Sequence, residues 1–156
     1  MIWLTAEIQF PSPETASKEG IIALGGDLSV ERLLHAYKNG IFPWYSEGDP
    51  IIWYCPPERM VLFPDELKIS KSMKKVLRKN EFVITENQAF KEVIYQCKHV
   101  ARNDEFDTWI TDDMEQAYIQ LHQLGIAKSI EVWQVDTEHS RSDQEATKQL
   151  VGGLYG

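Results

Sequence analysis

The stretch LKISKSMKKVLRKNEFVITENQAFKEVIYQC, residues 67–97, decides the fold class because it predicts a helix, a strand and a second helix in succession. Ser70 is a favoured N-cap residue, and the helix that it begins runs through about Asn80. Residues 81–85, EFVIT, combine aromatic and β-branched side chains, which is typical of a strand. A small sheet covered by helices from the same part of the chain is expected here, which is an α+β fold.

Two further helices follow the strand. Thr85 and Gln88 have the spacing of a capping box, and apolar residues then recur at helical spacing. These residues are Phe90, Val93, Ile94, Cys97 and Ala101. Thr111 is expected to cap the next helix, and Gly125 is expected to end it.

Residues 128–135, KSIEVWQV, alternate apolar and polar side chains, which predicts a strand, and QLVGGLYG at 149–156 resembles a second one. The segment between them, 136–149, is polar throughout and is expected to be a long hairpin loop. The expected order after residue 62 is therefore helix, strand, helix, helix, strand, strand.

Residues 1–62 differ in composition, since Gly, Pro and aromatic residues are frequent there. Within them GGDLSVERLLHAYKNG predicts one helix, started by Asp27 or Ser29 and ended by Gly40. We expect a small N-terminal domain of loops and short helices over residues 1–62, followed by a second domain over residues 63–156.

Composition excludes several classes of protein. A hydrophobic fraction of 43% in 156 residues supports one domain, or two small ones that share a core. Two cysteines, Cys55 and Cys97, make neither a disulfide framework nor a zinc quartet, and they are typical of a reducing, cytoplasmic compartment. The four histidines lack metal-ligand spacing, and no apolar run has the ~18 residues of a membrane span. We therefore expect no metal, no cofactor and no membrane association.

The charge of the chain is segregated. The net charge is −8, yet six of the 16 basic residues fall between positions 68 and 79, where no acidic residue occurs. On a helix, five of them share one face: Lys71, Lys74, Lys75, Arg78 and Lys79. Met73, Val76 and Leu77 lie on the other side and are expected to pack inward. A purely cationic face predicts a polyanion partner, although a solvated face neutralised by acids elsewhere has the same pattern.

Tryptophans in loops are the second indication. Trp44 and Trp53 lie in a Gly- and Pro-rich stretch, and Trp109 follows an acidic segment. Most tryptophans belong to a core, but a loop tryptophan can stack on a nucleobase. Together with the basic face, this pattern predicts binding of an RNA end.

Several motifs together resemble the leucyl/phenylalanyl-tRNA–protein transferase family. They are FPSPE (10–14), GGDLS (25–29), GIFPWYS (40–46), TWIT (108–111), SIEVW (129–133) and LVGGLYG (150–156). The resemblance implies bacterial, cytoplasmic enzymes that transfer Leu or Phe, and Met less well, from aminoacyl-tRNA to proteins with N-terminal Arg or Lys. The products are directed to degradation by the N-end rule pathway. It also implies a small N-terminal domain joined to a domain like the GNAT acetyltransferases.

The resemblance also implies roles for particular residues. Trp44 and Trp109 match tryptophans at the site of the 3′-terminal adenosine, and Tyr37 and Tyr118 match neighbours of that site. Leu154 matches an apolar residue of the pocket for the Leu or Phe side chain. The five-residue basic face matches the family's cluster for the tRNA acceptor stem. The acceptor's α-amine attacks an ester that is already activated, so the reaction needs neither ATP nor metal.

The chain also departs from the family. The family continues with a GES-type motif, whose Glu belongs to the aminoacyl site, and with a later Asp and Gln assigned to catalysis; none is in this sequence. The segment 136–149 resembles an insertion. We therefore expect an N-terminal part of such an enzyme, without catalytic residues of its own, and a non-catalytic tRNA-binding fragment is the alternative.

Two other enzyme classes fit less well. An acetyltransferase cofactor loop would need Gly or Ala where Leu154 stands, with a helix following. Neither Cys55, before two prolines, nor Cys97, on an apolar helix face, resembles an activated nucleophile.

Overall fold

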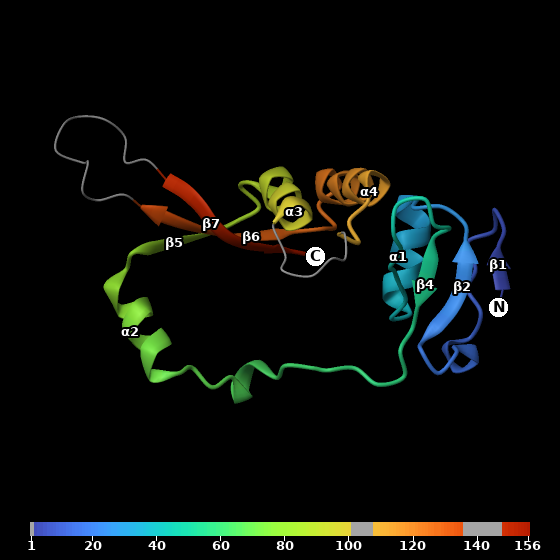
Figure 1. Ribbon diagram of the computed structural model, residues 1–156, viewed down its shortest axis with the longest axis horizontal. Helices are drawn as coiled ribbons and strands as arrows, with labels where there is room; N and C mark the ends of the chain where they lie inside the picture. Colours follow the sequence, from blue (N-terminus) through green and yellow to red (C-terminus); the bar gives the residue numbers. More distant parts are fainter. Residues whose placement is uncertain (1, 101–107, 136–147) are drawn as a thin grey trace.

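The computed structural model describes residues 2–100, 108–135 and 148–156, and it is a mixed α+β structure with two separate sheets (Figure 1). The first part comprises β1 (Ile2–Leu4), η1 (Pro13–Thr15), β2 (Ile21–Gly25), α1 (Val30–Lys38), β3 (Phe42–Pro43) and β4 (Ile52–Tyr54). The second comprises η2 (Pro64–Glu66), α2 (Lys71–Lys79), β5 (Phe82–Glu86), α3 (Phe90–His99), α4 (Asp112–Gln123), β6 (Ser129–Val135) and β7 (Lys148–Tyr155).

The N-terminal region contains a four-stranded sheet in the order β1-β2-β4-β3, which the expectation of loops and short helices missed, although the expected helix is present as α1. Strand β1 runs parallel to β2, whereas β4 is antiparallel to both β2 and β3. Trp53 anchors this sheet: it is fully buried, its indole N–H donates to the Gly25 carbonyl at 2.8 Å, and Phe10 packs against its ring edge-on. These strands are too short to show an alternating pattern, and their partners are distant in sequence.

Helix α1 has the expected ends. The Ser29 hydroxyl accepts a hydrogen bond from the Arg32 amide at 3.4 Å, and Gly40 ends the turn with φ +69°. The Arg32 guanidinium is fully buried and donates to the carbonyl of Thr5 at 2.8 Å and to Asp27 at 3.2 Å. This one side chain therefore ties the start of the chain to α1.

The second sheet has the antiparallel order β5-β6-β7, and helices α3 and α4 cover one face (Figure 1). The buried residues of the two helices are Phe90, Val93, Ile94, Met114, Ala117, Tyr118 and Leu121. The predicted strands 128–135 and 149–156 are confirmed as β6 and β7, and the strand 81–85 is confirmed one residue later as β5. Thr111 caps α4 as expected, because its hydroxyl accepts from the Met114 amide at 3.2 Å.

The predicted capping box is wrong. Thr85 lies within β5, and α3 begins at Phe90, where the N-cap residue Ala89 has no side-chain acceptor. A carboxylate from another strand replaces the box: Glu131 in β6 accepts hydrogen bonds from Thr85 and from the amides of Gln88 and Ala89. An acceptor that comes from a distant strand leaves no local signal in the sequence.

Helix α2 has its expected limits, Ser70 as N-cap and Asn80 as C-cap, but its environment differs from the expectation. None of its residues is buried, and Leu77 is 59% exposed, so the expected inward packing of Met73, Val76 and Leu77 is wrong. The helix follows an extended connection and lies at the far end of the molecule from α1 (Figure 1). The predicted polar loop 136–149 falls outside the described residues, except that Lys148 and Gln149 begin β7.

Candidate functional site

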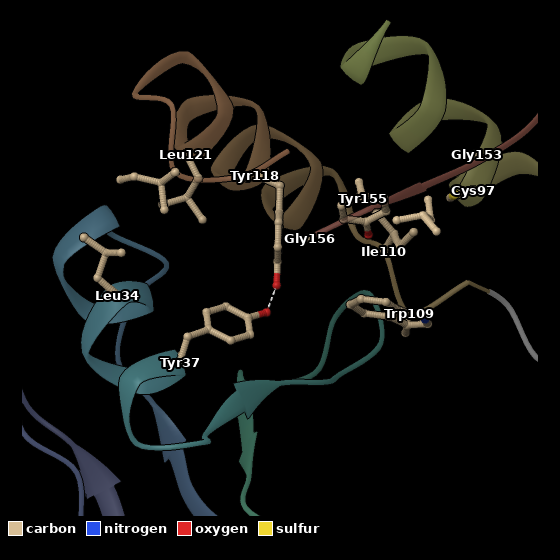
Figure 2. A pocket seen from close by; sticks show the side chains of 13 residues that line it. Leu34, Tyr37, Cys97, Trp109, Ile110, Tyr118, Leu121, Gly153, Tyr155 and Gly156 are labelled. Carbon is tan, nitrogen blue, oxygen red and sulfur yellow. Dashed lines mark hydrogen bonds between the residues drawn. The ribbon is translucent and has the colours of Figure 1, made fainter. Parts of the chain in front are cut away.

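A cavity of about 660 Å³ lies between α1, α4, the segment before α4 and the end of β7 (Figure 2). Its lining is largely apolar. The lining residues are Leu34, Tyr37, Cys97, Trp109, Ile110, Tyr118, Leu121, Ile126, Ala127, Gly153, Leu154, Tyr155 and Gly156. This size and a largely apolar wall with few polar groups are typical of a small-molecule pocket.

Two tyrosines that are 81 positions apart in sequence meet at this cavity. Tyr37 from α1 and Tyr118 from α4 point toward one another, and their hydroxyl groups share a hydrogen bond (Figure 2). Tyr118 is buried, whereas 46% of Tyr37 is exposed. Burial raises the pKa of Tyr37 to about 12. The protonated hydroxyl can donate a hydrogen bond to a bound molecule.

Trp44 and Trp109 form a second, smaller hollow beside the first. Its volume is about 260 Å³, and its lining is Phe42, Pro43, Trp44 and Trp109. Trp109 belongs to both cavities, and Trp44 is 54% exposed with its ring 5.9 Å from that of Tyr54. An exposed indole that lies beside a cavity gives a flat surface for stacking.

The structure thus brings the five predicted pocket residues together. Tyr37, Trp109, Tyr118 and Leu154 line the larger cavity, and Trp44 lines the smaller one. Sequence reasoning did not assign Leu34, Cys97 or Tyr155 to the cavity. Leu34 could have been found, because it is three positions before Tyr37 on the same helix face. Tyr155 could not have been found in this way, because its position at the cavity depends on how β7 is paired with β6.

The predicted basic face lies on α2, and no residue of α2 lines either cavity. In Figure 1, α2 lies far from α1 and α4, which contribute to the larger cavity. Its five side chains belong to an exposed helix, and Lys79 pairs with Glu81 at 2.9 Å. The Ser70 hydroxyl accepts from the Met73 amide at 3.1 Å, so the first turn of this helix is capped. The basic face and the cavities are therefore on different parts of the molecule. A ligand that uses both has to extend from one to the other.

The described residues contain neither a metal-binding cluster nor a membrane-spanning helix. Among residues 2–100, 108–135 and 148–156, no group of three or more His, Cys, Asp or Glu side chains could hold a metal ion. Within the same ranges, no helix is long and apolar enough to cross a membrane.

Comparison with known proteins relates these features to one family. The model of the family described as leucyl/phenylalanyl-tRNA protein transferase matches residues 61–156, and the model of that family's N-terminal domain matches residues 26–57. The chain belongs to this family of aminoacyltransferases.

Three of the relatives named leucyl/phenylalanyl-tRNA–protein transferase illustrate the similarity. Those of Flavobacterium psychrophilum and Flavobacterium johnsoniae are 50% and 51% identical over all 156 residues, which correspond to 68% of each relative's length. The relative from Syntrophobacter fumaroxidans is 50% identical over 153 residues, or 98% of this chain and 60% of its own length. The chain therefore spans between 60% and 68% of these three proteins.

Proposed function

We propose that the two adjoining cavities hold the 3′ end of an aminoacyl-tRNA charged with Leu or Phe, or less well with Met. The observation that carries this proposal is the meeting of Trp44 and Trp109 beside an apolar cavity of about 660 Å³. The indoles stack on the terminal adenine, while the apolar wall around Leu154 accepts the amino-acid side chain.

The basic face of α2 binds the acceptor stem of the same tRNA in this proposal. Its five cations release counterions from the phosphates, which supplies affinity without reading sequence. In this proposal the hydroxyls of Tyr37 and Tyr118, which share a hydrogen bond at the cavity, bind ribose or ester oxygens of the ligand. The proposed cytoplasmic location follows from the family.

The reaction proposed for the family member as a whole is aminoacyl transfer to the N-terminal Arg or Lys of an acceptor protein, marking that protein for N-end rule degradation. The α-amine attacks the ester carbonyl, a C–N bond forms, the bond to the 3′ oxygen breaks, and the amine proton passes to the departing oxygen. Orientation of amine and ester supplies a large part of the acceleration. We propose that residues 63–156 belong to a GNAT-like domain that follows an N-terminal domain over residues 1–62.

One observation favours the alternative, a tRNA-binding chain without transferase activity. The described residues that line the large cavity include no carboxylate and no imidazole, so they provide no ordinary base for the α-amine. The aromatic walls and the basic face are present nonetheless.

A transfer assay with a binding arm separates these functions. The 156-residue chain is given tRNA charged with labelled leucine and a protein with N-terminal Arg, with the same protein bearing N-terminal Ser as control. Label on the Arg protein alone supports the transferase. Absence of label with retained tRNA binding supports the alternative, and absence of both overturns the proposal.

A further inference from the structure

Glu131 is an unusual residue in the core of the second domain. It lies in the middle of β6 with 0% of its surface exposed, and none of the ion pairs among the described residues includes it. Four donors bind its carboxylate. The Ser129 hydroxyl lies 2.6 Å from Oε1, the amides of Gln88 and Ala89 each lie 3.2 Å from Oε1, and Thr85 donates to Oε2.

These donors explain how a buried carboxylate keeps its charge. Burial opposes the charged form, but the hydrogen bonds from Ser129, Thr85 and the two amides outweigh it and lower the pKa of Glu131. The amides immediately precede α3, where the helix dipole also favours a negative group. Glu131 therefore anchors the two residues that lead into α3, Gln88 and the N-cap residue Ala89, whose own side chain offers no acceptor.

A series of aromatic ring contacts connects the start of α3 to the large cavity. Phe90, the first residue of α3, is 2% exposed and packs edge-on against Tyr155 at 5.9 Å. Tyr155 packs in the same way against Tyr118 at 5.5 Å, and the Tyr118 hydroxyl meets that of Tyr37. Tyr118 and Tyr155 both line the large cavity (Figure 2).

The backbone couples the same elements. Glu131 is paired with Gly153 in the sheet, and a Cβ on Gly153 would lie 2.9 Å from the side chain of Val93 in α3. Helix and strand are thus in close contact, with no space for a side chain at Gly153. A shift of the start of α3 toward the sheet would press on the end of β7, which carries Tyr155.

We propose that Glu131 is a positioning residue of the cavity: its carboxylate holds Gln88 and Ala89 at the entry to α3, and through Phe90 and Tyr155 it sets the place of Tyr118. The consequence for substrate rests on the proposed function, whereas the effect on the tyrosine rings does not. A cap with a merely local role would stabilise α3 and leave Tyr118 in place.

Fluorine NMR of the full chain labelled with meta-fluorotyrosine tests this proposal, with resonances assigned from single Tyr→Phe variants. We expect Glu131→Gln to move the resonances of Tyr118 and Tyr155. Glu92→Gln is the matched control, since Glu92 is exposed in the first turn of α3 and its carboxylate accepts a hydrogen bond from the Gln96 side chain. Unmoved Tyr118 and Tyr155 resonances in a folded Glu131→Gln protein would overturn the proposal.

Ser129→Ala is the second variant, for use if Glu131→Gln does not fold. It removes one donor to Oε1 and leaves the carboxylate in place. Smaller movements of the same two resonances support the proposal, and unchanged resonances reject it.

A binding measurement tests whether the position of Tyr118 affects binding of the substrate. The probe is the leucyl amide of 3′-amino-3′-deoxyadenosine, measured by calorimetry, and we expect Glu131→Gln to weaken its binding by about threefold to tenfold. Glu92→Gln should bind it as the unmodified protein does. If the unmodified protein does not bind the probe, the proposed function fails, while the fluorine result still decides the role of Glu131.

Discussion

The two faces of the second sheet contrast sharply. On one face, α3 and α4 bury Val93, Ile94 and Met114 almost completely. On the other, Ile84 and Leu154 are 61% and 62% exposed. Strand β5 nevertheless reads Phe-Val-Ile at residues 82–84, a continuous apolar run that is typical of strands covered on both faces. Helices α3 and α4 thus cover one face of this sheet, whereas the other face exposes apolar side chains, which is the composition of a contact surface.

The largest expected effect lies in the covered core of the molecule. Trp53→Ala should lower the free energy of unfolding by about 3–5 kcal/mol, because the side chain is fully buried and its N–H bonds Gly25. Leu77→Ala on α2, where the side chain is exposed, should change it by less than about 0.5 kcal/mol. Urea unfolding of both variants measures the difference. Equal losses would mean that α2 is packed as firmly as the N-terminal sheet.

The next effect concerns aromatic rings that remain exposed beside the packed core. Trp44→Ala or Trp109→Ala should weaken binding of tRNA by about 1–3 kcal/mol through the loss of base stacking. Trp3→Ala is the control, since Trp3 is exposed on β1 and lines neither cavity. The measurement is a filter-binding titration with intact tRNA and with tRNA that lacks the terminal adenosine. Equal losses for both RNAs would contradict stacking on that base.

The third prediction concerns the basic face of the exposed helix α2 and tests whether this helix contributes to binding of tRNA. Lys74→Glu combined with Lys75→Glu should weaken tRNA binding about tenfold at moderate salt and flatten its dependence on salt, because fewer counterions are released. Lys18→Glu with Lys91→Glu gives the same change of charge at exposed positions elsewhere. The slope of log Kd against log salt is measured for both pairs. Identical slopes would exclude a special role for α2.

The smallest effect is a dependence on alkaline pH at the cavity. The folded state holds the proton of Tyr37 up to a pKa of about 12, above the ordinary value of 10.0. As pH rises above 10.0, the unfolded chain therefore loses this proton first, and stability falls until about pH 12. Tyr37→Phe should remove part of that fall. Urea midpoints compared below and above pH 10 measure it, and parallel curves for both proteins would contradict it.

The sequence predicted the helices and strands whose signals are local. Ser29, Ser70 and Thr111 were each identified as caps or helix starts, and each accepts the expected backbone hydrogen bond. The N-terminal strands escaped because β1 pairs with β2 across a gap of some twenty residues, and no short window contains both. The capping of α3 escaped for the same reason, since its acceptor lies on β6.

The candidate site was predicted through the motifs rather than through physical pattern. Periodicity gives the helix faces of Tyr37 and Tyr118, but it does not bring α1 and α4 together. The expected inward packing of Leu77 failed because an apolar helix face shows only that a residue can be buried, and its partner has to be present as well.

The hydroxyl contact between Tyr37 and Tyr118 has a thermodynamic consequence. One side of the large cavity comes from α1 and the other from α4 and β7, so a molecule in the cavity binds only when the two halves are together. Binding of a molecule in the cavity is therefore coupled to the association of α1 with α4 and β7. The bound molecule stabilises both sides of the cavity by mass action. Amide protons of α1 and α4 should consequently report the same free energy of opening in hydrogen exchange when the cavity is filled, and different free energies of opening when it is empty.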